Sequence, residues 1–255
     1  MFRKRAESVG SYSKVAHFYD YLMRHVEYDR WYQYIIKLLN TYGIETKNIL
    51  EIACGTGIML EKFAIHGYHV FGMDASRIML QEATRRIDSK YDSLFWCGDM
   101  RQFSVTPNFD AVICLYDSIN YCMSINAFKQ TLFNAVAALT PSGILIFDVC
   151  TIRNCKMNFR DYTETDGIGN IEYTRTARFD SIRNVQLNEF FVAMDTEDGQ
   201  KYYIEKHVQQ MYKLEKLASI IRQQDNMELI GIFDNFSKRP GSESSSRVHF
   251  VIRKR

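Results

Sequence analysis

The six cysteines of this 255-residue chain show no Cys-x-x-Cys spacing, so the sequence lacks the usual signature of a zinc site. They stand at positions 54, 97, 114, 122, 150 and 155, and most of them fall in or beside segments expected to form strands. Such cysteines typically act as small apolar core residues in a reducing compartment. The sequence therefore predicts neither a disulfide framework nor a metal site.

The chain also lacks a charge bias and a long hydrophobic run. Its formal net charge is +2, and basic triplets occur only near the two ends, as Arg3-Lys4-Arg5 and Arg253-Lys254-Arg255. A phosphate-backbone footprint needs a basic patch, so nucleic acid is not an expected partner. No apolar stretch reaches the length of a membrane span, and none follows the charged N-terminus. We expect a soluble, cytoplasmic protein that does not bind membranes.

Residues 47–57 read as a buried strand that runs into a turn of small residues, Ala53-Cys54-Gly55-Thr56-Gly57. Such a turn lets the backbone approach a ligand at a strand end. The dinucleotide fingerprint requires a third glycine on the following helix, and that position is Leu60 here. The turn therefore favours a nucleoside-containing ligand and disfavours a dinucleotide.

Acidic residues accompany the first three predicted strands. Glu51 lies at the end of the first strand, Asp74 ends the second, seventeen positions after Gly57, and Asp99 follows the third. An acid at the end of the second strand is the usual group that binds ribose hydroxyls. Structural explanations stay open: Glu51 as a solvated carboxylate, Asp74 as a helix cap in competition with Ser76, and Asp99 as a turn residue.

Strand and helix patterns alternate from residue 47 to residue 149, which predicts a parallel sheet with helices on both faces. After residue 149, polar and apolar residues alternate, which favours antiparallel strands. Two helices are expected before the sheet, while residues 1–11 are expected to be mobile. The predicted strands are 47–52, 68–73, 94–97, 110–116, 143–149, 171–179, 185–194, 202–212, 228–236 and 246–252, and the predicted helices are 14–24, 28–41, 58–66, 76–87, 124–139 and 213–224.

The ordered acids and the glycine turn resemble the class I S-adenosyl-L-methionine (SAM)-dependent methyltransferases. The resemblance implies an α/β, Rossmann-like fold: a seven-stranded, mostly parallel sheet whose last strand enters antiparallel, with an inserted antiparallel sheet. It also implies four segments. These are an N-terminal helical lid (1–45), the first part of the SAM-binding domain (46–152), an inserted sheet that shapes the substrate site (153–211) and the end of the SAM-binding domain (212–255).

In that family the glycine turn receives the methionine part of SAM, the second acid binds the ribose and the third acid binds the adenine amine. The resemblance thus assigns Asp74 to the ribose and Asp99 to the adenine, with Phe95 and Trp96 as apolar walls. Glu51 would orient the turn and attract the ammonium group of SAM. The expected cofactor-binding residues are Tyr12, Tyr19, Glu51, Ala53, Cys54, Gly55, Gly57, Asp74, Ala75, Asp99, Met100, Leu115 and Ser118.

The loop after the fourth strand, residues 115–121, has the sequence Leu-Tyr-Asp-Ser-Ile-Asn-Tyr and no proline. Adenine and glutamine amide methyltransferases carry Asn/Asp-Pro-Pro-aromatic at this place. Cytosine carbon-5 methyltransferases need a Pro-Cys nucleophile, and no cysteine of this chain follows a proline. Both classes of nucleic-acid methyltransferase are therefore disfavoured.

The motifs Tyr19-Asp20, Gly72-x-Asp74-x-Ser76 and Gly98-Asp99-Met100-Arg101 resemble the small-molecule methyltransferases that include the amino-sugar N,N-dimethyltransferases. The likeness covers residues 12–149 and thins afterwards to Glu205-x-His207 and the run from Arg247 to Val251. In that family N-terminal tyrosines approach the methionine end of SAM, which makes Tyr12 and Tyr19 candidates for cofactor binding and catalysis. Their alternative role is aromatic core. His207 is a third catalytic candidate, or else a structural histidine.

The sequence thus predicts an enzyme that transfers a methyl group from SAM to a small molecule, with nitrogen favoured over oxygen as the acceptor. In-line displacement from a sulfonium depends on alignment and desolvation, so it requires neither a metal cluster nor a nucleophile motif. Two alternatives stay open, a methyltransferase acting on a protein or RNA and a non-catalytic SAM-binding protein. A homodimer is one option for the oligomeric state.

Overall fold

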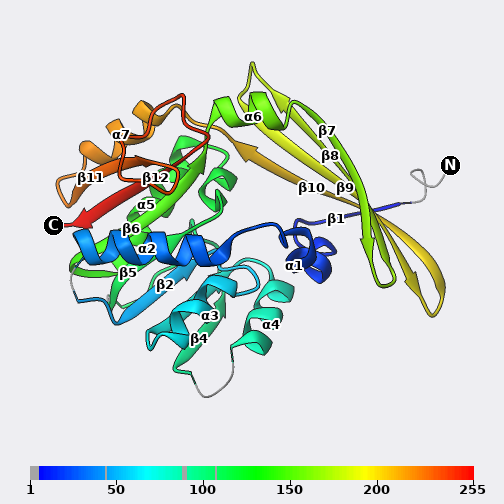
Figure 1. Ribbon diagram of the computed structural model, residues 1–255, viewed down its shortest axis with the longest axis horizontal. Coiled ribbons are helices and arrows are strands. Elements are labelled where there is room, and N and C mark those ends of the chain that lie inside the picture. Colours follow the sequence, from blue (N-terminus) through cyan, green and yellow to red (C-terminus); the bar gives the residue numbers. More distant parts are fainter. Residues whose placement is uncertain (1–5, 44, 88–90, 107) are drawn as a thin grey trace.

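The computed structural model describes residues 6–43, 45–87, 91–106 and 108–255 (Figure 1). The N-terminal basic triplet Arg3-Lys4-Arg5 lies outside the described residues. Within them, no helix is both long and apolar enough to cross a membrane.

A seven-stranded sheet with the order β11-β12-β6-β5-β2-β3-β4 forms the larger part of the structure. The strands β4, β3, β2, β5 and β6 run parallel to one another. Strand β12 lies between β6 and β11 and is antiparallel to both. The predicted α/β sheet with an antiparallel last strand is therefore confirmed. The strands are β2 (Asn48–Ile52), β3 (His69–Asp74), β4 (Ser93–Cys97), β5 (Phe109–Cys114), β6 (Leu139–Cys150), β11 (Met227–Asp234) and β12 (Arg247–Lys254).

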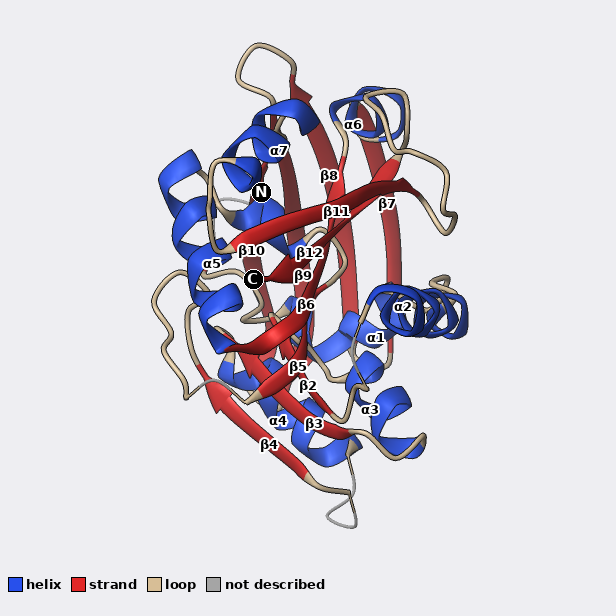
Figure 2. Ribbon diagram, turned by 90° about the vertical axis from the view of Figure 1, so that its left-hand side faces the viewer, coloured by secondary structure: helices blue, strands red, loops and turns tan. Residues whose placement is uncertain are grey.

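Helices cover both faces of this sheet (Figure 2). On one face, Phe128 of α5 belongs to a buried cluster with Leu50 of β2, and on the other, Phe63 of α3 belongs to a cluster with Ile49. The neighbouring residues Ile49 and Leu50 thus enter opposite cores, as the two-residue repeat of a strand requires. The helices around the sheet are α2 (Tyr28–Tyr42), α3 (Ile58–Ile65), α4 (Arg77–Arg86), α5 (Ile125–Ala138) and α7 (Leu214–Arg222).

A second sheet of five strands, in the order β1-β10-β9-β8-β7, stands beside the first (Figure 1). Strands β7 to β10 pair antiparallel, and β1 pairs parallel with β10. The strands are β1 (Glu7–Val9), β7 (Asp161–Ile168), β8 (Ile171–Asp180), β9 (Val185–Thr196) and β10 (Gly199–Gln210). The remaining elements are η2 (Val15–Phe18), α1 (Tyr19–Leu22), η3 (Ser118–Tyr121) and α6 (Ile152–Asn158).

The inner face of the second sheet has an apolar half and a polar half. In the apolar half, Phe18 stacks on Tyr173 with ring centroids 4.8 Å apart, and it also contacts Phe190. The polar half presents five buried polar side chains from β9 and β10, which are Gln186, Asn188, Glu205, His207 and Gln209. Buried polar groups need partners, so this half of the sheet is built to face other polar groups.

The prediction that residues 1–11 are mobile is wrong for the described part of that segment. Residues Glu7–Val9 form β1, in register with Tyr203 to Glu205 of β10, and the Ser11 hydroxyl donates to the carbonyl oxygen of Lys206. The open edge of β10 supplies unpaired backbone groups that hold this polar segment. The division of the chain into four segments (1–45, 46–152, 153–211 and 212–255) stays a prediction.

Candidate active site

The glycine turn after β2 contains three residues with left-handed backbone angles: Ala53 (φ 57°), Gly55 (φ 56°) and Gly57 (φ 76°). A Cβ atom on Gly55 would have no atom within 4 Å, so Gly55 faces open space at the carboxyl ends of the strands. A Cβ atom on Gly57 would lie 2.9 Å from the Cβ atom of Ala83 on α4. Gly57 therefore has a packing role that the sequence did not reveal, and its cofactor role stays a prediction.

Asp74, at the end of β3, holds the glycine turn in place. Its carboxylate accepts hydrogen bonds from the backbone N–H groups of Gly55 (2.9 Å) and Ser76 (2.8 Å). Burial raises the pKa of Asp74, and the backbone hydrogen bonds oppose this shift without cancelling it. The helix cap is Ser76, whose hydroxyl accepts from the backbone N–H of Met79. Asp74 is thus a buried acceptor beside the turn and not the cap of α4.

Glu51 is buried beneath the same turn. Its side chain is 3% exposed, and its Oε2 atom has no hydrogen-bond partner. Burial, with a smaller contribution from the nearby Asp74, raises the pKa of Glu51 well above its usual value. The solvated-carboxylate alternative is therefore wrong. An unpaired buried carboxyl is costly in the free protein, and a cationic or N–H-bearing group bound above the turn would satisfy it.

The N-terminal segment covers this turn. The Thr56 hydroxyl donates to Oδ1 of Asp20 (2.6 Å), and the Arg86 guanidinium forms an ion pair with the same carboxylate. The Ser76 hydroxyl donates to the carbonyl oxygen of Tyr12 (3.1 Å). The chain near Tyr12 and Asp20 therefore contacts the loops that follow both β2 and β3.

The predicted adenine residues lie at the next strand end. Asp99 accepts hydrogen bonds from the backbone N–H of Arg101 (2.8 Å) and from its Nε atom (2.9 Å), and these hydrogen bonds lower the pKa of Asp99. Phe95 and Trp96 pack into the cores on opposite faces of β4, because successive strand residues point in opposite directions. The prediction that both rings wall one adenine slot is therefore wrong.

The other expected cofactor residues surround the same edge of the sheet. Ala75 accepts a hydrogen bond at its carbonyl oxygen from the Cys97 thiol (3.5 Å), and Ser118 donates to the carbonyl oxygen of Leu115 (2.8 Å). Cys54 and Leu115 are buried, and Met100 packs against the core that contains α5. The structure thus gathers the loops after β2, β3, β4 and β5, and the individual cofactor contacts stay predictions.

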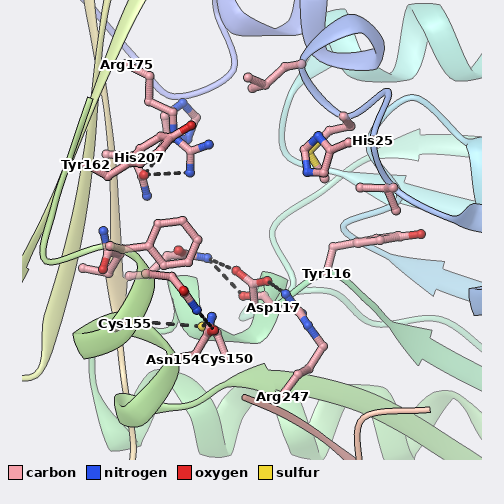
Figure 3. Close-up of a pocket in the computed structure, with 18 of the residues that line it drawn as sticks. His25, Tyr116, Asp117, Cys150, Asn154, Cys155, Tyr162, Arg175, His207 and Arg247 are labelled. Atoms are coloured by element: carbon pink, nitrogen blue, oxygen red, sulfur yellow. Dashed lines mark hydrogen bonds and ion pairs between the residues drawn. The ribbon is translucent and has the colours of Figure 1, made fainter. Parts of the chain in front are cut away.

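A cavity of about 940 Å³ lies between the two sheets, next to these loops (Figure 3). Its walls come from the N-terminal segment, the connection between α1 and α2, the loop after β5, α6, the inner face of β7 to β10 and the start of β12. Tyr12 and Tyr19 line it, together with His207. The three catalytic candidates therefore share one cavity.

A chain of hydrogen bonds runs from the cavity into the second sheet. The Tyr12 and Tyr121 hydroxyls lie 2.9 Å apart, and the Tyr121 hydroxyl lies 2.8 Å from Nδ1 of His207. Nε2 of His207 lies 2.8 Å from Oε1 of Glu205, whose side chain is fully buried. Tyr121 and Glu205 were not among the predicted site residues, although Tyr121 ends the loop at residues 115–121 and Glu205 belongs to the Glu205-x-His207 motif.

Glu205 also anchors the N-terminal segment. Its carboxylate accepts hydrogen bonds from the backbone N–H groups of Tyr12 (2.5 Å), Lys14 (2.7 Å) and Val15 (3.1 Å). Burial alone would raise the pKa of Glu205, but hydrogen bonds from His207 and these backbone groups outweigh burial and lower it. Glu205 is therefore ionised at neutral pH.

An acid–arginine cluster forms the opposite wall. Arg247 of β12 lies 2.6 Å from Oδ1 of Asp117 and pairs with the fully buried Asp148 of β6. Burial favours the neutral form of Arg247, but the attraction of both carboxylates outweighs it and raises the pKa of the guanidinium. Gln209 donates to the second carboxylate oxygen of Asp117 (2.7 Å), which fixes the loop after β5 against the second sheet.

Within the part of the chain that the structure describes, no group of three or more His, Cys, Asp or Glu side chains could hold a metal ion. The six cysteines are all free thiols, and five of them are buried. The cavity presents hydroxyl, imidazole, carboxylate, guanidinium and thiol groups.

Known proteins resemble this chain over most of its length. A methyltransferase-domain family model matches residues 49–143. YqeM of Bacillus subtilis (strain 168), a candidate methyltransferase, is 31% identical over 248 residues, which cover 95% of this chain and 97% of that protein. The crystal structure of a SAM-dependent methyltransferase from Clostridium acetobutylicum has a TM-score of 0.80 at 22% identity and covers 95% of this chain and 98% of that one.

A third relative matches less than half of the chain. The dTDP-4-amino-2,3,4,6-tetradeoxy-D-glucose N,N-dimethyltransferase of Saccharopolyspora spinosa is 28% identical over 114 residues, which is 45% of each chain. The full-length relationship, the strand order and the glycine turn between two acidic strand ends lead to the same conclusion: this chain belongs to the class I SAM-dependent methyltransferases.

Proposed function

We propose that this methyltransferase binds SAM across the loops after β2, β3 and β4 and transfers its methyl group to an amine nitrogen of a small molecule in the cavity. When bound, SAM supplies an electrophilic methyl group on a sulfonium. The residues of the chain fit it: the unpaired Oε2 of Glu51 would face the ammonium group, Asp74 the ribose, and Asp99 with Met100 the adenine. The other expected cofactor residues would complete the site.

The cavity between the two sheets is the observation that carries the small-molecule part of the proposal. Its volume of about 940 Å³ lies within the range of pockets that enclose small ligands. The second sheet lines it on one side, and the N-terminal segment lines it on another. These walls leave a hollow of small-ligand size between them, which favours a small acceptor over a folded protein or an RNA helix.

The hydrogen-bond chain gives the reason for proposing an amine. Because Glu205 is ionised, it accepts the proton on Nε2 of His207, and Nδ1 is then the acceptor for the Tyr121 hydroxyl. Tyr121 in turn accepts from Tyr12. Each hydrogen in this series of hydrogen bonds is thus donated away from Tyr12, towards Glu205. The free lone pairs of the Tyr12 oxygen remain as an acceptor for an N–H group of the substrate.

Hydrogen bonds donated in this direction can carry a proton away from an ammonium group of the substrate. As Tyr12 takes a proton from the acceptor, its own proton passes to Tyr121 and the Tyr121 proton passes to Nδ1 of His207. The imidazolium formed is stabilised by Glu205, in the manner of a carboxylate–histidine pair. Burial raises the pKa of both tyrosines, so each hydroxyl transmits a proton and does not remain ionised. The neutral nitrogen then attacks the methyl carbon as the sulfur–carbon bond breaks.

Proposed partners and location follow from the same features. The acceptor is a small molecule, with no nucleic acid or membrane partner, and the monomer-or-homodimer question stays open. The six free thiols support a reducing compartment such as the cytoplasm.

Methyl-labelled SAM and a cell extract test the class of acceptor. The labelled extract is separated into small-molecule, protein and RNA fractions, with the His207→Asn variant as the comparison. We expect label in the small-molecule fraction with the wild-type enzyme and much less with the variant. Label confined to protein or RNA would contradict the small-molecule proposal.

A further inference from the structure

Two buried thiols lie in contact on the wall of the cavity. Cys150 ends β6 and Cys155 belongs to α6, and their Sγ atoms are 3.7 Å apart. Both residues line the cavity, and Figure 3 shows them beside Asn154. Cys150 keeps 6% of its surface exposed and Cys155 none, so a small solute in the cavity can contact Cys150, while Cys155 lies behind it.

The local structure of α6 brings these two residues together. Thr151 is the N-cap, and its hydroxyl accepts a hydrogen bond from the backbone N–H of Asn154 (3.2 Å). Cys150 precedes the cap, and Cys155 is the fourth residue of the helix. These are the two positions that pack together as an apolar pair at many helix starts. Here a pair of thiols occupies them.

The two thiols are chemically different. The Asn154 side-chain N–H donates to the Cys150 sulfur (3.0 Å), and the Cys150 and Cys155 sulfurs lie within hydrogen-bond distance of each other (3.7 Å). These hydrogen bonds lower the pKa of Cys150 although burial opposes them, whereas the pKa of Cys155 is raised. Burial also raises the pKa of Cys54 and Cys114. Cys150 is thus the better nucleophile of the pair.

We propose that Cys150 and Cys155 form a modification site at which a small hydroperoxide oxidises the two thiols to a disulfide. The Cys150 sulfur attacks one peroxide oxygen, the O–O bond breaks, and water or an alcohol leaves as Cys150 becomes a sulfenic acid. Cys155 then attacks the Cys150 sulfur, the S–O bond breaks and water leaves. Each thiol gives up one hydrogen, the peroxide is reduced, and an excess of an external dithiol reverses the change.

The disulfide would change the acceptor side of the cavity. A bond length of about 2.05 Å requires the sulfurs to approach from 3.7 Å, through rotation of the two side chains and a shift of α6 against β6. Asn154, Met157 and Asn158 of α6 line the cavity and would move with it. The glycine turn follows β2 and does not contact α6 in any described hydrogen bond. We therefore expect oxidation to disturb acceptor binding and to spare SAM binding, a consequence that rests on the proposed function.

Peptide mapping tests the modification without any assay of methyl transfer. The reduced protein is treated with hydrogen peroxide, free thiols are blocked, and the protein is cleaved with trypsin. Arg153 separates the two cysteines and Lys156 follows Cys155, so a disulfide would link the peptides 130–153 and 154–156. We expect this linked pair, and its conversion to two blocked peptides after dithiothreitol. A pair that stays reduced while the exposed Cys97 is oxidised would overturn the proposal.

Two variants assign the roles of the thiols. In Cys155→Ser we expect a sulfenic acid at Cys150 that dimedone traps, and in Cys150→Ser we expect no dimedone adduct at Cys155. Adducts in the reverse pattern, or in neither variant, would refute the assignment. Cys97→Ser is the matched control, since it removes an exposed thiol and should leave the linked peptide pair intact.

The functional consequence is measured on the wild-type protein. Fully oxidised enzyme should transfer less label from SAM into the small-molecule fraction, dithiothreitol should restore the transfer, and the SAM dissociation constant should stay unchanged in calorimetry. Unchanged label transfer by oxidised enzyme would refute the effect on the cavity. If neither form transfers label to a small molecule, the proposed function fails, and the peptide map still decides whether the modification site exists.

Discussion

The hydroxyl groups of Tyr12 and Tyr121 lie 2.9 Å apart and join the N-terminal segment to the loop after β5. This contact places the end of the hydrogen-bond chain in the cavity, between the loops of the parallel sheet and the polar half of the second sheet. In the proposed function, the N-terminal segment therefore both covers the site and supplies one reacting hydroxyl.

Removal of the Tyr12 hydroxyl should separate catalysis from SAM binding. Tyr12→Phe keeps the ring and the backbone contact with Ser76 but breaks the path to His207. We expect kcat to fall by about 100-fold or more, the scale of lost acid–base assistance, with unchanged SAM affinity. The control is Tyr21→Phe. It removes a hydroxyl that donates to Asp166 and takes no part in the hydrogen bonds from Tyr12 to Glu205. Equal losses in both variants would argue against a specific role of Tyr12.

The buried Glu51 should make the free enzyme less stable as the pH rises. Its folded-state pKa is raised above the ordinary value of 4.5, so its contribution is fully present below that pH and is lost as the pH rises towards the folded pKa. Glu51→Gln cannot ionise. We expect the variant and the wild type to be equally stable near about pH 4, and the variant to gain about 1.4 kcal/mol per pH unit above about pH 5 until the folded pKa is reached.

Urea unfolding of both proteins without SAM measures this difference, and calorimetry measures SAM binding. SAM should bind more weakly to Glu51→Gln, because the amide cannot pair as strongly with an ammonium group. Parallel stability curves at all pH values would show that Glu51 ionises normally in the folded protein.

Asp74 should contribute to both stability and cofactor affinity. Asp74→Ala should weaken SAM binding by roughly 2–3 kcal/mol, the scale of lost charge-assisted hydrogen bonds. It should also destabilise the fold by about 1–3 kcal/mol, because the N–H groups of Gly55 and Ser76 lose their acceptor. Calorimetry and chemical denaturation separate the two effects. SAM affinity that is unchanged in folded protein would exclude Asp74 from the ribose site.

The two glycines of the turn should respond differently to an added methyl group. Gly57→Ala should destabilise the fold because its Cβ atom would lie 2.9 Å from that of Ala83, and the second change Ala83→Gly should restore part of the loss. Gly55→Ala meets no steric neighbour, and its left-handed angle alone costs about 1–2 kcal/mol. It should nevertheless weaken SAM binding. Thermal unfolding measures the stability of all three variants, and calorimetry measures their SAM affinity. A Gly55→Ala enzyme with normal SAM affinity would argue against a close approach of the cofactor to the turn.

The sequence predicted the parallel sheet well, because its signals are local. Apolar strands, the glycine turn and the Ser76 cap each occupy a few consecutive residues, and the observed bounds of β3 and α4 differ from the prediction by one residue at each end. The helix at residues 28–41 was found for the same reason, and Gly43 follows its end at Tyr42.

Contacts between distant residues could not be predicted in this way. Tyr121 and His207 are 86 positions apart, and nothing in either local pattern indicates that a hydrogen bond joins them. Strand β1 forms because the edge of β10 is open, so a polar segment that looked mobile is ordered. The packing role of Gly57 depends on Ala83 of the next helix. These features depend on tertiary structure, in which partners outside the local pattern decide the outcome.

The atom that receives the methyl group tests the central claim most directly. The enzyme is incubated with SAM that carries a deuterated methyl group and with a small-molecule extract, and tandem mass spectrometry locates the label in each product. We predict a deuterated methyl group on an amine nitrogen, formed much more slowly when Tyr12→Phe replaces the wild type. Label on oxygen or carbon, or product formation that is equal in the two proteins, would contradict the account.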